Sequence, residues 1–137
     1  MRRLATVAGA LAAAVGLLAG CGADIQSPDL FVLTRTGQGQ KLTLLVNDSG
    51  TIRCDGRPAK KMSDRLLLVA RDLADTLDQD AKAKLRLPTP SNSVFSYKVR
   101  LQDGTIYFPD TAGSSHQELA QAEQFAVEAA QGPCGLT

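Results

Sequence analysis

The chain has 137 residues, of which 44% are hydrophobic and 4% are aromatic, and its formal net charge at pH 7 is +1. This length is enough for one domain with a modest hydrophobic core. Nucleic-acid binding calls for a basic patch or stripe, so the nearly balanced charge gives it no support and no nucleic-acid partner is expected.

The first twenty residues have the pattern of an export signal. Arg2 and Arg3 form a positive n-region, and residues 4–20 form an apolar run that ends in small residues. A transmembrane helix usually needs about 20 predominantly apolar residues, and this run is shorter. We therefore predict that residues 1–20 are a signal peptide.

The end of the apolar run resembles the lipobox of bacterial lipoprotein precursors. Leu18, Ala19, Gly20 and Cys21 match its branched apolar residue, its two small residues and its cysteine. The resemblance implies cleavage after Gly20 and a diacylglyceryl group on the thiol of Cys21. The alternative is an ordinary secreted protein with a cysteine near its cleavage site.

An acylated Cys21 determines where the protein is expected to reside. A single myristoyl-length chain binds a membrane marginally, whereas two or more chains anchor a protein stably. The lipobox therefore predicts a protein that is lipid-anchored at the extracytoplasmic face of the cell membrane. Residues 21–28 are then the lipidated anchor and spacer, and residues 29–137 are expected to form a single α+β domain.

The two remaining cysteines suit the same compartment. Cleavage after Gly20 leaves thirteen basic and fourteen acidic residues, with Cys54 and Cys134 as an even pair. Disulfides persist outside the cytoplasm, so we predict a structural disulfide between these two residues. A reactive thiol needs an activating neighbour that the sequence does not show, and a metal site needs more ligands at closer spacing.

The first half of the domain has the pattern of three strands followed by a helix. The strands are expected at residues 29–36, 41–46 and 51–54, joined by turns at residues 37–40 and 47–50. Residues 55–61 are expected to form a basic loop, and Ser63 is expected to cap a helix over residues 64–85. One face of that helix carries apolar residues at helical spacing, which predicts a core contact: Leu66, Val69, Ala70, Leu73 and Leu77.

The second half predicts a hairpin and a last helix. Residues 94–101 alternate between apolar and polar side chains, and Asp103 and Gly104 predict a tight turn before a strand over residues 105–108. Ser115 and Glu118 have the spacing of a capping box for a helix over residues 116–131. The predicted fold class is α+β: an antiparallel sheet of two hairpins (about five strands) with two helices packed on one face, in the order β-β-β-α-β-β-α.

Residues that often carry catalysis or metal binding are sparse. His116 is the only histidine, and no motif places a nucleophile beside it, so we interpret it as a solvated residue at a helix start. Asp75, Asp78 and Asp80 lack the alternating ligands and the glycine of an EF-hand loop, which favours a polar helix face. The sequence predicts no catalytic residue, no metal ligand and no cofactor.

Two further groups of charged residues leave alternatives open. Arg57, Lys60 and Lys61 either contact anionic lipid head groups or wall polymers, or form a solvated loop, which is the simpler interpretation. Asp103 and Asp110 are carboxylates that an enzyme would have to bring together in the fold. We expect Asp103 to serve only the turn.

The mature chain resembles two groups of proteins. The stretches CGADIQSPDLFVLTRTGQG, DSGTIRCDG and SYKVRLQDGT resemble uncharacterised small lipoproteins of high-GC Gram-positive bacteria. The order of TRTGQGQKLTL, the Leu87 and Pro88 pair, FSYKVRLQDGT and FPD is similar to that of emfourin-type inhibitors of thermolysin-like metalloproteases. The signal peptide and the Cys54 and Cys134 pair depart from the second group, whose resemblance implies protease inhibition but assigns no contact residue.

These patterns lead to two functional hypotheses. The first is a surface lipoprotein without intrinsic catalysis, a binding or accessory module of the bacterial cell envelope, whose partners are the membrane and an unidentified envelope or secreted protein. The alternative is a tethered inhibitor of a thermolysin-like secreted metalloprotease. An enzyme ranks third because no catalytic constellation is visible in the sequence.

Overall fold

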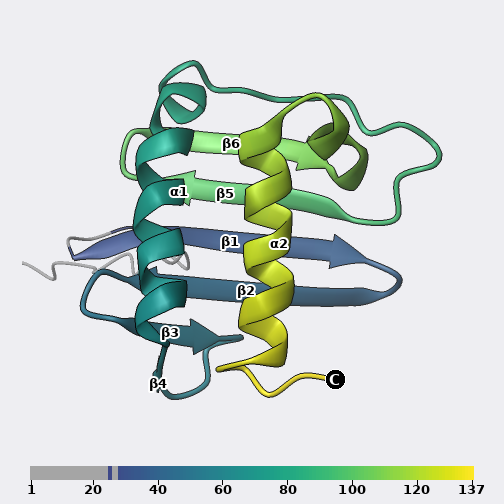
Figure 1. Cartoon of the computed structure of the whole chain (residues 1–137). Helices are drawn as coiled ribbons and strands as arrows, with labels where there is room; N and C mark the ends of the chain where they lie inside the picture. Colours follow the sequence, from purple (N-terminus) through teal and green to yellow (C-terminus); the bar gives the residue numbers. More distant parts are fainter. Residues whose placement is uncertain (1–24, 26–27) are drawn as a thin grey trace, which may run out of the picture.

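The computed structural model describes residues 25 and 28–137, which form one antiparallel sheet with two helices on one of its faces (Figure 1). The strands are β1 (Asp29–Gly37), β2 (Gln40–Asn47), β3 (Thr51–Cys54), β4 (Lys60–Lys61), β5 (Ser96–Leu101) and β6 (Gly104–Pro109). The helices are α1 (Asp64–Lys82), the short 3-10 helix η1 (Asp110–Ser114) and α2 (Gln117–Gln131). The α+β class, the antiparallel sheet and the two helices are as predicted.

The sheet has six strands where about five were expected. The additional strand β4 lies within residues 55–61, which were expected to be a loop: Lys60 pairs with Ile52, and Lys61 pairs with Thr51. The chain can return to β3 because Asp55 and the glycine after it both have positive φ. A short edge strand made of two lysines protects the sheet, because its length and its charges disfavour pairing with a strand of another molecule.

The two hairpins are joined through their first strands, which gives the spatial order β4-β3-β2-β1-β5-β6. Strand β1 is central and pairs antiparallel with both β2 and β5. The outer edge of β6 is also paired, since Leu87 donates its N–H to the carbonyl of Tyr107 at 2.9 Å and Tyr107 donates to the carbonyl of Leu85 at 3.0 Å. Hydrophobic periodicity predicts the individual strands but not this order.

Helix α1 begins as predicted and ends three residues earlier than expected. The Ser63 hydroxyl accepts a hydrogen bond from the N–H of Leu66 at 3.2 Å. The helix ends at Lys82 because Lys84 has a φ of 54° and Leu85 turns toward the edge of β6. The buried face of α1 consists of Leu66, Ala70, Leu73, Leu77 and Ala81, and Val69 is only partly buried.

The predicted capping box of α2 is wrong. The helix begins at Gln117, and its N-cap is His116, whose side chain makes no capping hydrogen bond. Ser115 belongs to the end of η1, because its N–H and that of His116 both bond to the carbonyl of Ala112. Residues 110–114 form a 3-10 helix that the sequence patterns did not predict, and Ser115 is the C-cap of this helix.

The core lies between the two helices and the face of the sheet that they cover. Phe31 of β1 meets Phe125 of α2 edge to face, with ring centroids 5.5 Å apart. At the C-terminal end of α2, the predicted pair Cys54 and Cys134 lies at disulfide distance, with sulfur atoms 1.96 Å apart. In the chain-entropy model a bridge of this sequence separation contributes about 4 to 5 kcal/mol.

Candidate functional site

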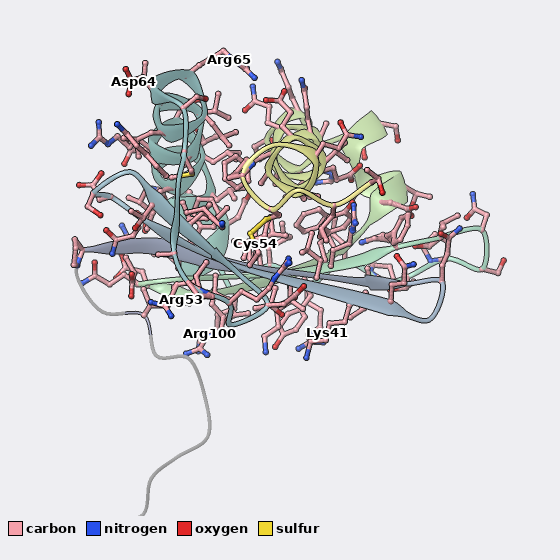
Figure 2. All side chains as sticks on the ribbon, turned by 90° about the horizontal axis from the view of Figure 1, so that it is seen from below. Lys41, Arg53, Cys54, Asp64, Arg65 and Arg100 are labelled. Atoms are coloured by element: carbon pink, nitrogen blue, oxygen red, sulfur yellow. A yellow bond between two sulfur atoms is a disulfide. The ribbon has the colours of Figure 1, made fainter. Side chains whose placement is uncertain are left out.

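The sheet face opposite the helices is covered by no helix or strand within the described residues. Figure 2 shows Lys41, Arg53 and Arg100 on this side of the sheet, whereas Asp64 and Arg65 lie on the helix layer. We define the open face as the surface formed by the strand residues that alternate with the core residues and point away from α1 and α2. Its basic side chains are Lys41, Arg53, Lys61, Lys98 and Arg100.

The strand register places these cations on one surface. Directly opposed residues of an antiparallel pair project to the same side of the sheet. Thr36 pairs with Lys41, and Thr34 pairs with Lys98, while the flanking Leu33 and Val99 are buried against the helices. The open face therefore carries a cation on β2, β3, β4 and β5, with threonines between several of them.

A tyrosine and an arginine extend this surface at β6. Lys98 pairs with Tyr107 across the strands, and the Nζ atom of Lys98 lies 5.7 Å from the centre of the tyrosine ring. The Cζ atom of Arg86 lies 3.8 Å from the same ring centre, which is cation–π distance. An open groove of about 460 Å³ passes between this arginine and Ser96.

Charge is divided between the two layers of the molecule. The six strands contain seven basic residues and one acidic residue, a net charge of +6. Helices α1 and α2 contain three basic and eight acidic residues, a net charge of −5. The described part of the chain is thus nearly neutral because two layers of opposite charge cancel.

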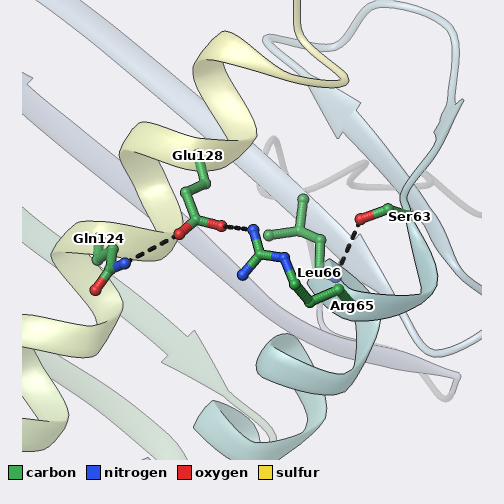
Figure 3. A network of polar contacts seen from close by, with 5 residues as sticks. All are labelled: Ser63, Arg65, Leu66, Gln124 and Glu128. Atoms are coloured by element: carbon green, nitrogen blue, oxygen red, sulfur yellow. Dashed lines mark hydrogen bonds and ion pairs between the residues drawn. The ribbon is translucent and has the colours of Figure 1, made fainter.

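The basic residues of the helix layer are already paired. Arg65 bonds to Glu128, which also accepts a hydrogen bond from Gln124 (Figure 3). Arg71 lies 2.6 Å from a carboxylate oxygen of Asp48, and Lys82 lies 2.6 Å from one of Asp78. In contrast, Lys41, Arg53 and Lys61 on the open face form no ion pair with any residue in the described part of the chain.

A second feature is the loop of residues 88–95, between α1 and β5. We call it the braced loop because one carboxylate holds it in place. Asp110 accepts hydrogen bonds from the hydroxyl of Ser93 at 2.8 Å and from the N–H groups of Val94 and Phe95, each at 3.1 Å. Burial raises the pKa of Asp110, but these hydrogen bonds outweigh burial and hold the pKa below its ordinary value. The Val94 side chain is 47% exposed on this braced loop.

Glu123 of α2 is the carboxyl group with the most unusual environment. Burial, followed by the negative charge of nearby Asp110, raises its pKa from 4.5 to about 7. Its Oε1 atom is buried and has no hydrogen-bond partner among the described residues. No sequence motif singles out this residue, although an acid beside Ala122 within the apolar stripe of the helix was an available signal.

Other residues singled out from the sequence are not brought together. Asp103 and Asp110 lie just beyond opposite ends of β6, so the two carboxylates do not form a pair. Asp78 is in an ion pair with Lys82, and the described residues contain no group of three or more His, Cys, Asp or Glu side chains placed to hold a metal ion. His116 is half-buried, with its Nδ1 atom 3.2 Å from the hydroxyl of Ser115.

The basic cluster of residues 57–61 is divided by strand β4. The side chain of Arg57 donates to the carbonyl of Cys54 at 3.3 Å, and with Lys60 it lines a hollow beside the disulfide. Lys61, which pairs with Thr51, belongs to the open face. The cluster is therefore not one surface, and only one of its members joins the cations of the other strands.

The predicted anchor lies outside the described residues, which include neither Gly20 nor Cys21. Within residues 25 and 28–137, no helix combines the length and the apolar composition needed to cross a bilayer. Comparison of the chain with family models, with curated proteins and with solved structures found no match. The surface itself is therefore the basis for assigning a function.

Proposed function

We propose that this chain is a membrane-anchored lipoprotein of the bacterial cell envelope, held through Cys21, and that its domain is a binding module without intrinsic catalysis. The open face is its binding surface. The observation that carries the proposal is that three basic side chains of this face, Lys41, Arg53 and Lys61, form no ion pair within the described part of the chain. Charges that are not used inside the molecule are available to a partner.

The two unusual carboxyl groups support a structural role over a catalytic one. Asp110 is engaged by one hydroxyl and two backbone N–H groups of the braced loop. The buried Oε1 of Glu123 would lie 3.5 Å from a Cβ atom on Gly113, so it lies close to η1.

Site-specific crosslinking in cells tests the binding module. A photoreactive amino acid is placed at Thr34 or Thr43 on the open face of the full precursor, and the products are identified by mass spectrometry. The control probe replaces Leu68, which is 62% exposed on the opposite layer. We expect specific products from the two open-face positions and not from Leu68. Products from Leu68 alone would contradict the proposal.

The anchor is tested separately. Cells that express the precursor are fed an alkyne analogue of palmitate, and label is expected on the wild-type protein but not on the Cys21→Ser variant. Equal label on both proteins, or label on neither, would contradict lipidation at Cys21. This readout is independent of what the open face binds.

A tethered inhibitor of a thermolysin-like metalloprotease is the second candidate, and the braced loop favours it. Protease inhibitors commonly present a rigid, exposed segment to the enzyme, and Val94 is an exposed apolar side chain on a segment fixed by Asp110. The test adds the oxidised protein to thermolysin. Inhibition that Val94→Asp abolishes and that the matched surface variant Leu68→Asp retains would establish this function. No inhibition by the wild-type protein would exclude it for thermolysin.

A further inference from the structure

We propose that the open face lies on the anionic phospholipid head groups of the membrane that carries the anchor. This inference rests on the lipid anchor of the proposed function and names the partner of the same surface. It orients the domain, with the sheet toward the bilayer and the helices α1 and α2 toward the surroundings.

The charge distribution supports this orientation. Basic side chains project from adjacent strands of one surface, and Lys41, Arg53 and Lys61 have no ion-pair partner in the described chain. The helix layer on the opposite side has a net charge of −5. An anionic membrane attracts the first layer and repels the second, and each cation near the surface raises binding about five-fold.

The shape and composition of the face also suit a lipid surface. Short side chains such as Thr34 and Thr43 separate the cations, so several long basic side chains can reach one plane of head groups together. Tyr107 adds an aromatic ring beside Lys98 and Arg86, and tyrosine is enriched at the head-group level of membranes.

The length of the tether makes this contact intramolecular. Seven residues lie between Cys21 and Asp29, the first residue of the central strand β1. Fully extended, the eight residue-to-residue steps from Cys21 to Asp29 span at most roughly 28 Å. The anchor therefore keeps the sheet close to the lipid at a high effective concentration, so an attraction too weak for a free domain suffices to hold the face down.

Lysine footprinting of the intact lipidated protein tests the contact. The protein is placed in vesicles of phosphatidylcholine alone or of phosphatidylcholine with phosphatidylglycerol, and exposed amines are acetylated and located by mass spectrometry. We expect Lys41, Lys61 and Lys98 to react about five-fold more slowly in the anionic vesicles. Lys60 and Lys84, which are not on the open face, are internal controls that should react equally in both. High salt should remove the protection.

A matched pair of variants separates position from net charge. The double variant K41E/K98E reverses two charges of the open face, and K60E/K84E makes the same change in net charge elsewhere. Protection of Lys61 in anionic vesicles should disappear in the first variant and persist in the second. Loss of protection in both variants would mean that only net charge matters, and it would overturn the proposed orientation.

The outcomes keep this inference distinct from the proposed function. Equal acetylation of the open-face lysines in both kinds of vesicle overturns membrane docking. If the Thr34 and Thr43 probes still capture a protein in cells, the proposal of a binding module is supported, and that protein is what the open face binds. Failure of palmitate labelling at Cys21 overturns the anchor on which both proposals rest.

Discussion

The two faces of the sheet differ in composition although the same strands form them. On β2, Leu42, Leu44 and Val46 are buried under the helices, whereas Lys41 and Thr43 point to the open side. The covered face is apolar because burying apolar side chains away from water is favourable. The open face can carry charges because they remain hydrated. The apolar core and the charged surface are therefore encoded by alternate residues of the same segment.

The largest expected effect is a loss of stability on truncating a core residue of β2, with its neighbour on the open face as the control. Leu44→Ala removes a fully buried side chain from the core and is expected to lower the free energy of unfolding by about 3 kcal/mol. Thr43→Ala alters only the open face and is expected to change it by less than about 0.5 kcal/mol. Urea unfolding of the oxidised proteins measures both values. Equal losses would contradict the division of roles between the faces.

A somewhat smaller effect is expected where α1 approaches the β5–β6 turn. A Cβ atom on Gly104 would lie 2.1 Å from the carbonyl oxygen of Ala81, a backbone atom that cannot rotate away. Gly104→Ala should therefore cost about 2 kcal/mol of stability. Gln102→Ala, an exposed change in the same turn, is the control and should have little effect in a thermal unfolding experiment.

The smallest expected effect is a pH dependence of stability that arises from the carboxyl group of Glu123 in α2. The folded-state pKa of Glu123 is about 7, whereas its ordinary value is 4.5, so the folded state holds this proton more tightly. Ionisation in the unfolded chain therefore reduces stability as pH rises from about 4.5 to about 7, with no further loss above that. Because the group is only partly buried, we expect the total loss to be about 1 to 2 kcal/mol.

Glu123→Gln should remove this pH dependence. The variant is expected to be more stable than the wild type at pH 8, and the difference should shrink toward pH 4.5. Urea unfolding across this pH range measures the difference between the two proteins. A constant difference at every pH would show that the carboxyl group ionises alike in the folded and unfolded states.

The local elements were predictable because they depend on neighbouring residues. Residues 51–54 form the predicted strand, and Ser63 caps α1 as predicted. The predicted hairpin is present, but its turn lies one residue earlier than predicted, at Gln102 and Asp103, because Gly104 pairs with Leu101 as the first residue of β6. Period-two and helical hydrophobic patterns report which side of an element is buried, and they do so without knowledge of the rest of the fold. The pairing of Cys54 with Cys134 followed from counting cysteines.

Errors occurred where backbone outside the local pattern decided the outcome. Residues 60–61 form a strand because the edge of β3 is available to pair with them, and the cap predicted at Ser115 is absent because Ser115 is the C-cap of η1. The capping pattern is local, but whether it forms depends on the preceding backbone. Position along the chain could not predict that Glu123, and not Asp103, is the carboxyl group near Asp110.

The sequence by itself determined the fold class, the disulfide pair, the positions of most helices and strands, and the prediction of a lipid anchor. Only the tertiary structure decided that β1 pairs with β5, and this pairing aligns Lys98 and Arg100 of one hairpin with Lys41 and Arg53 of the other. The basic residues are scattered along the sequence, and in the overall composition their charge is cancelled by the acidic residues of the helices. A charged surface arises from strand order, which long-range pairing sets.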